Sequence, residues 1–184
     1  MGLNPDCTII FIHTPKAAGS TLWRVIHRQY DKTSCFQIKS SDSRDYRELP
    51  IEERRQKKIL RGHIYYGTHE FVPGPFTYIT MLRDPVDRII SHYYFVLRTP
   101  HHGLYDEVTS RNLTLRDYVL SGLRGETNNG QTRLIAGEES TSLPYGQCPP
   151  ELLETAKRNI EKDFTLVGLT ERFDETLILL KRAF

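Results

Sequence analysis

The chain of 184 residues is 38% hydrophobic and 26% charged, with a formal net charge of +2 and three cysteines. This suits a single domain, residues 1–184, in which roughly 70% of the unfolded surface becomes buried. The small charge argues against a nucleic-acid partner, no apolar run reaches the ~20 residues of a membrane span, and the unpatterned cysteines exclude a zinc site or a disulfide framework. We therefore expect a cytoplasmic protein, or a soluble domain of a longer one, that binds no metal; the sequence gives no signal for oligomeric state.

Five short apolar runs have the length and composition of strands, at 7–13, 34–39, 59–66, 76–82 and 164–170. Helical patterns follow Gly19 and cover about 50–57, 84–98, 114–123, 149–163 and 173–182. The last pattern runs almost to the end of the sequence, which leaves open that further residues follow. Strands that alternate with helices predict an α/β fold, P-loop-like and three-layered, with a mostly parallel central sheet and helices on both faces.

The stretch "HTPKAAGSTL" joins the first predicted strand to its helix. A helix N-terminus with a lysine, a glycine and hydroxyl side chains is suited to hold a phosphate-like group. Capping residues of an ordinary helix are the alternative for an isolated motif of this kind, and the flanking strand and helix favour the anion site. The predicted cradle comprises Lys16, Ala17, Ala18, Gly19, Ser20 and Thr21.

This loop differs from that of P-loop nucleotide hydrolases, in which the lysine directly precedes the hydroxyl that holds magnesium. Here Lys16 comes three residues before Gly19. Asp84 follows the strand at 76–82, but Pro85 after it is typical of a helix N-cap rather than of a magnesium ligand. The sequence therefore predicts an anion site that needs no metal.

A second anion site is predicted where the strand at 76–82 ends, in "MLRDPVDRIISHYY". On a helical wheel, Ser91 and Arg88 point away from an apolar stripe that contains Val86 and Tyr93. Arg83 and Ser91 together could bind one phosphate, whereas either residue alone would suit an ordinary surface position. Ligands of open α/β sheets bind at the carboxyl ends of strands, so we expect both loops at one edge of the sheet.

These two motifs together resemble the sulfotransferases that use 3′-phosphoadenosine 5′-phosphosulfate, in particular the carbohydrate branch that includes the heparan sulfate 2-O- and 6-O-sulfotransferases. The resemblance implies that the lysine loop holds the 5′-phosphosulfate, that Arg83 and Ser91 hold the 3′-phosphate, and that adenosine 3′,5′-bisphosphate is the product. "NNGQTRLIAG" (128–137) resembles a segment that lines the active site in this family, which makes Asn129 and Arg133 candidate substrate contacts; a helix cap would also explain Asn129.

Transfer of a sulfuryl group to a hydroxyl requires a base, and a histidine near its ordinary pKa is the usual choice. His63 follows Gly62 at the end of a predicted strand, and the resemblance implies a histidine base between the two loops. His69 is the second candidate, and a histidine that merely caps the strand is the structural alternative. Lys16 would stabilise the leaving phosphate.

The predicted function is therefore sulfuryl transfer from 3′-phosphoadenosine 5′-phosphosulfate to an acceptor hydroxyl, with a carbohydrate favoured by the resemblance. Two alternatives stay open at this point. One is an atypical P-loop nucleotide kinase, and the other is a non-catalytic nucleotide-binding domain. The residue pattern names neither the acceptor nor the position that is sulfated.

Overall fold

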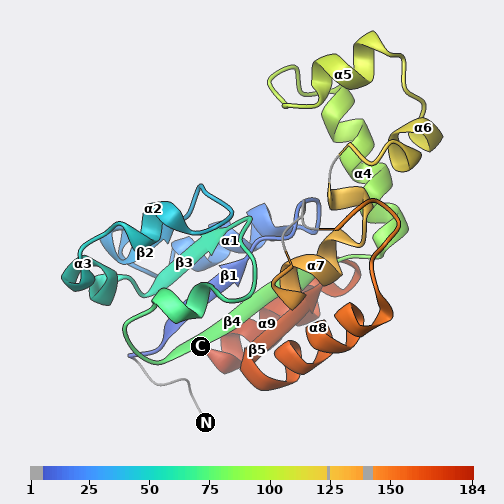
Figure 1. Ribbon diagram of the computed structural model, residues 1–184. Helices are drawn as coiled ribbons and strands as arrows, with labels where there is room; N and C mark the ends of the chain where they lie inside the picture. The colour runs from blue at the N-terminus through green and yellow to red at the C-terminus, as the bar shows by residue number, and fades with distance from the viewer. Residues whose placement is uncertain (1–5, 124, 139–142) are drawn as a thin grey trace.

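A computed structural model describes residues 6–123, 125–138 and 143–184. Over these residues the chain forms one parallel sheet in the order β2-β3-β1-β4-β5, with no antiparallel pairing among the described strands (Figure 1). The strands are β1 (Thr8–Ile12), β2 (Cys35–Gln37), β3 (Ile59–Gly62), β4 (Phe76–Leu82) and β5 (Phe164–Leu169). The predicted α/β class with a parallel sheet is confirmed.

The helices confirm the longer sequence patterns and add short elements that periodicity did not indicate. Their bounds are α1 (Gly19–His27), α2 (Arg44–Arg47), α3 (Ile51–Gln56), α4 (Pro85–Leu97), α5 (Tyr105–Ser110), α6 (Leu115–Leu120), α7 (Gly130–Ala136), α8 (Pro150–Asp163) and α9 (Phe173–Ala183), with 3-10 turns η1 (Lys32–Ser34), η2 (Thr68–Phe71), η3 (Gly125–Thr127) and η4 (Thr170–Arg172). Helices α2, α5 and α7 were not among the predicted patterns. Within the described ranges, no helix combines the length and the apolar character that crossing a membrane requires.

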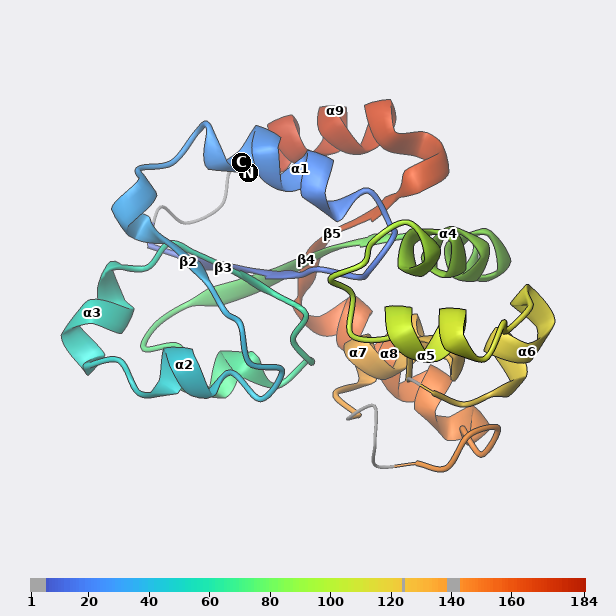
Figure 2. The same cartoon turned by 90° about the horizontal axis from the view of Figure 1, so that it is seen from above.

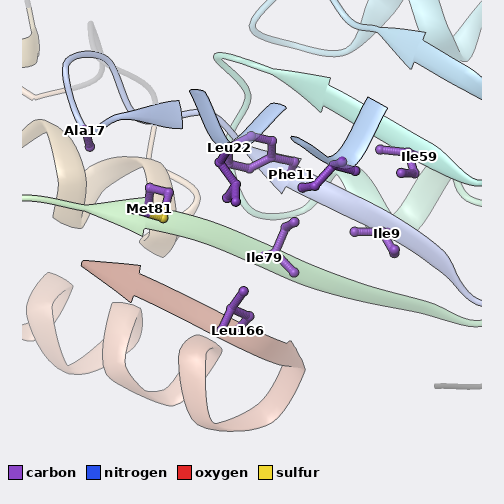
Figure 3. Packing of buried hydrophobic residues seen from close by; sticks show 9 residues of the cluster. Ile9, Phe11, Ala17, Leu22, Ile59, Ile79, Met81 and Leu166 are labelled. Carbon is purple, nitrogen blue, oxygen red and sulfur yellow. The ribbon is translucent and has the colours of Figure 1, made fainter. Parts of the chain in front are cut away.

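Helices cover both faces of the sheet (Figure 2). Helices α1 and α9 lie on one face, and α2, α3, α7 and α8 lie on the other. Alternate residues of each buried strand supply the two cores, because successive side chains of a strand point to opposite faces. Ile9 and Phe11 of β1 pack with Leu22 of α1 in the first core (Figure 3), and Ile10 and Ile12 belong to the second.

Strand β3 ends earlier than the predicted segment 59–66. Its pairing with β1 ends where Ile12 lies beside Gly62, and His13 donates its N–H to the carbonyl of Gly62. Beyond that point Ile64 turns into the second core, and Tyr66 donates its N–H to Leu134 of α7. His63 therefore lies just after the carboxyl end of the strand, where it can face a site.

Helix α4 begins as predicted, but the face that it buries agrees with the prediction only in part: Tyr93 is buried as expected. Asp84 caps the helix and accepts the N–H groups of Val86 and Asp87 at 2.9 and 3.0 Å. Val86, assigned to the inward stripe, is 65% exposed, whereas Arg88 is 2% exposed. The reason is that α4 projects beyond the sheet and packs on α5 and α6, so its buried apolar residues are Tyr93 and Val96 (Figure 1).

Candidate active site

The loop between β1 and α1 has a backbone that places several N–H groups together. Lys16 and Ala18 adopt left-handed conformations, with φ of 64° and 56°. Such conformations cost a non-glycine residue about 1–2 kcal/mol and are concentrated at functional sites. The first turn of α1 follows directly: Thr21 donates its N–H to the carbonyl of Ala18 at 3.0 Å, and the N–H groups before it belong to the helix start, where partners within a helix are lacking. This loop therefore has the backbone of an anion cradle, as the sequence predicts.

Gly19 leaves the space that the side chain of its neighbour His13 occupies. A Cβ atom at Gly19 would lie 2.2 Å from Cδ2 of His13, far inside contact distance. The absence of a side chain at Gly19 lets the buried imidazole pack under the first turn of α1. The cradle and His13 are therefore packed directly against each other.

Arg83 lies at the carboxyl end of β4 and is held in place by Gln131 of α7. The N–H of Arg83 donates to Oε1 of Gln131 at 3.0 Å, and Nε2 of Gln131 donates to the carbonyl of Arg83 at 2.8 Å. The guanidinium Nη1 donates to the carbonyl of Lys16 at 3.4 Å. The two predicted anion-binding motifs therefore meet, as the sequence analysis requires.

Both motifs line one cavity of about 650 Å³, a size typical of small-molecule sites. From the predicted set it contains Lys16, Ala18, Gly19, Ser20, His63, Arg83 and Ser91, and it also contains His13, Pro15, His92, Phe95, His102, Glu126 and Thr170. A cavity of about 640 Å³ between α1 and α9 is lined mainly by apolar side chains. Converging cations, imidazoles and hydroxyls make the first cavity the candidate site.

Positive charge is concentrated around Lys16. Its Nζ lies 4.1 Å above the centroid of the Phe95 ring, which is a cation–π contact. Burial, followed by the charges of Arg98 and Arg83, lowers the pKa of Lys16 below its ordinary value. A bound anion would relieve this repulsion, so the charge pattern fits a phosphate or sulfate group.

His63 has the hydrogen bonding of a neutral base. Its Nδ1 lies 2.6 Å from the carbonyl oxygen of His13, which can only accept, so Nδ1 carries the proton and Nε2 is left as the basic nitrogen. The two imidazoles stack with centroids 4.6 Å apart. Burial is the main cause that lowers the pKa of His63, and Arg61 adds to it. At neutral pH the ring is therefore uncharged and able to accept a proton.

His13 supports this arrangement without titrating near neutrality. Nη2 of Arg61 donates to its Nδ1 at 2.9 Å. Burial, then the nearby charges of His63 and Arg61, lowers the pKa of His13 to about 3. The ring is therefore a neutral support for His63.

A smaller cavity of about 220 Å³ adjoins the first. The two share Pro15, His63 and Glu126. Arg133, which is 1% exposed, lines the smaller cavity together with Arg88. Arg133 thus lies beside His63, whereas Asn129 lies outside both cavities and makes no side-chain cap to α7.

The remaining predicted residues lie away from the cavity walls. The methyl group of Ala17 is buried in the first core, and Thr21 is exposed on α1. His69 stacks on Phe76, at a centroid distance of 4.5 Å, and shares a hydrogen bond with the hydroxyl of Tyr78. Because Phe76 begins β4, His69 lies toward the amino ends of the strands, whereas His63 lies at their carboxyl ends. His69 lines neither cavity.

Sequence reasoning did not assign Glu126, Phe95 or Gln131 to the site, nor the further cavity residues His92, His102 and Thr170. Phe95 lies four residues after Ser91, a spacing that places both on one side of α4 and could have indicated it. Gln131 belongs to residues 128–137, a further match to the family, but its contact with Arg83 spans 48 positions. No local pattern marks Glu126, which lies in a single 3-10 turn.

Comparison with known proteins decides the family. A sequence model of the sulfotransferase family matches residues 2–167. This chain belongs to the sulfotransferase family. It is 31% identical over 146 residues to the uronyl 2-sulfotransferase of Homo sapiens, covering 72% of this chain and 35% of that protein.

Longer matches at lower identity come from heparan sulfate 2-O-sulfotransferases. The Gallus gallus protein is 24% identical over 197 residues, which is 97% of this chain and 55% of the relative. The Caenorhabditis elegans protein is 24% identical over 192 residues, 94% of this chain and 59% of the relative. The matched part of this sulfotransferase thus corresponds to between 35% and 59% of the length of these relatives.

Proposed function

We propose that the chain transfers a sulfuryl group from 3′-phosphoadenosine 5′-phosphosulfate to a hydroxyl of a carbohydrate. The single observation that carries the proposal is the shared cavity in which the lysine loop, Arg83, Ser91 and His63 meet. Membership of the sulfotransferase family supports the donor. The cradle and the cations fit its two anionic ends, with Lys16 and the start of α1 at one and Arg83 with Ser91 at the other.

When bound, the donor supplies the sulfuryl group and a phosphate leaving group. Lys16 would neutralise the charge that grows on the bridging oxygen as the bond from sulfur to that oxygen breaks. The basic Nε2 of His63 would take the proton of the acceptor hydroxyl as its oxygen bonds to sulfur. Main-chain N–H groups of the cradle and the hydroxyl of Ser20 would hold the anionic oxygens.

The acceptor would enter through the smaller cavity, because His63 lies where the two cavities join. The relatives are named as uronyl and heparan sulfate 2-O-sulfotransferases, which favours a sugar hydroxyl. Two buried guanidinium groups, of Arg88 and Arg133, line this cavity and would favour a sugar that carries a negative charge.

The test compares binding with transfer in three variants. Lys16→Ala and Arg83→Ala should weaken binding of adenosine 3′,5′-bisphosphate at least about tenfold in calorimetry, since each removes a charge-assisted contact. His63→Ala should keep that binding and lower transfer of radiolabelled sulfate to a glycan panel by about 10²–10⁴-fold.

Lys157→Ala, on the exposed face of α8, is the matched control and should change neither quantity. Binding of magnesium-ATP without any response to the bisphosphate would favour a kinase instead. Tight bisphosphate binding with no transfer to glycans, lipids or phenols would leave a non-catalytic nucleotide-binding domain.

A further inference from the structure

Glu126 occupies the wall between the two cavities. Besides Pro15 and His63, it is the residue that both cavities share. It lies in η3, a single turn between α6 and α7. The buried guanidinium of Arg88 donates to the main-chain carbonyl of Glu126, which fixes this turn against α4. The carboxyl group is therefore held at the place where donor and acceptor would meet.

The side chain of Glu126 has a feature that the fold does not explain. Its Oε2 atom is buried and has no hydrogen-bond partner among the described residues. A buried carboxylate oxygen without a partner costs free energy, so it is expected only where another requirement keeps it. The cationic and titratable neighbours on α4 are Arg88 and His92.

His63 is surrounded by opposing charges. Burial lowers the pKa of His63 most, and the charge of Arg61 from β3 lowers it further. The main-chain carbonyl of His13, which accepts from Nδ1 of His63, and the charge of Glu126 from η3 both raise it. Lys16 and Arg83 add positive charge on the donor side of the same cavity. Glu126 thus supplies negative charge to a cavity otherwise dominated by cations.

We propose that Glu126 is a positioning residue that acts through His63: its carboxylate stabilises the imidazolium that forms when Nε2 of His63 takes the proton of the acceptor hydroxyl. The proton moves from the hydroxyl oxygen to Nε2 of His63 as that oxygen bonds to sulfur, and the side chains of Glu126 and His63 line the same two cavities. A carboxylate beside a catalytic histidine has this effect in other enzymes. The effect of Glu126 on sulfuryl transfer rests on the proposed function.

The test follows the protonation of His63 directly. Protein labelled with ¹³C at histidine Cε1 is titrated by NMR in the wild type and in Glu126→Gln, and the His63 signal is assigned by its loss in His63→Ala. Glutamine keeps the size of the side chain and removes its charge, so the pKa of His63 should fall. Glu126→Asp keeps the charge and should hold the pKa above that of Glu126→Gln, while Glu161→Gln, exposed on α8, should leave it unchanged.

Sulfate transfer gives the second measurement. In Glu126→Gln the acid limb of the kcat/KM profile should move to lower pH, and the plateau should fall roughly tenfold, a part of the 10²–10⁴-fold that a general base supplies. An unchanged pKa of His63 in Glu126→Gln would overturn the inference, and so would an unchanged pH profile. If the pKa falls but the wild type transfers no sulfate, the coupling of Glu126 to His63 stands and the proposed function fails.

Discussion

Gly19 occupies a position in the β1–α1 loop where no side chain larger than a hydrogen atom fits without a shift of its neighbours. The imidazole of His13 fills the space that a side chain at Gly19 would need. The same imidazole stacks on His63 and accepts from Arg61. A change at Gly19 should therefore be transmitted to the candidate base as well as to the cradle.

We expect Gly19→Ala to lower the free energy of unfolding by about 1–3 kcal/mol, the usual cost of overpacking a filled site. It should also weaken binding of adenosine 3′,5′-bisphosphate, because the first turn of α1 must move away from His13. Urea denaturation and calorimetry measure the two effects.

Ala18→Gly is the control at the neighbouring position. Ala18 has a left-handed φ of 56°, so glycine relieves about 1–2 kcal/mol of strain while losing methyl packing and chain stiffness. We expect a net change below about 1 kcal/mol. Unaltered stability together with unaltered affinity in Gly19→Ala would show that His13 does not constrain this position.

At the scale of elements, the turn from β4 into α4 is shaped by α7. Gln131 makes a two-way pair with the main chain of Arg83, and Thr170 donates its hydroxyl to the carbonyl of Leu82. Asp84 caps α4 on the other side of the turn. The position of the guanidinium of Arg83 thus depends on a helix that lies 48 residues further along the chain.

Gln131→Ala should therefore reduce affinity for adenosine 3′,5′-bisphosphate about tenfold. Two main-chain groups of Arg83 lose their partners, each loss being of about 1 kcal/mol when water replaces the amide. Isothermal calorimetry measures the affinity, and Gln56→Ala on the exposed face of α3 is the matched control. Equal affinity in the two variants would mean that Arg83 needs no support from α7.

At the scale of the whole molecule, buried neutral histidines make stability depend on pH. Burial is the main cause that lowers the pKa of His13 to about 3 and that of His92 to about 4, from an ordinary value of 6.5. Between these values and 6.5 the unfolded chain binds protons that the folded protein does not. Their contribution to stability is complete above pH 6.5 and is lost as the pH falls toward the folded values.

We therefore expect the free energy of unfolding to fall by about 1.4 kcal/mol per pH unit for each of these histidines below about pH 6. Urea denaturation between about pH 6 and pH 4.5 measures the slope. His92→Gln should reduce this slope by the contribution of one histidine, about 1.4 kcal/mol per pH unit. His101→Gln, at an exposed position, should leave the slope unchanged. A slope that is the same in all three proteins would show that His92 is protonated in the folded state.

The sequence by itself determined the strands, the longer helices and the cradle. Each depends on neighbours within a few positions: the buried run of β1, the Asp84-Pro85 start of α4, and the lysine, glycine and hydroxyls before α1. The joint position of the cradle and Arg83 also followed, because parallel strands bring their carboxyl ends to one edge of the sheet.

Only the tertiary structure decided which residues complete the site. The buried face of α4 followed only in part from its apolar stripe: Tyr93 is buried, but Val86 is exposed, because α5 and α6 rather than the sheet cover that helix. The positions of His63 and His69 also needed the fold, since His63 lines the cavity whereas His69 packs on Phe76 at the start of β4. Glu126 and Gln131 reach the site through contacts between distant segments, which local periodicity does not encode.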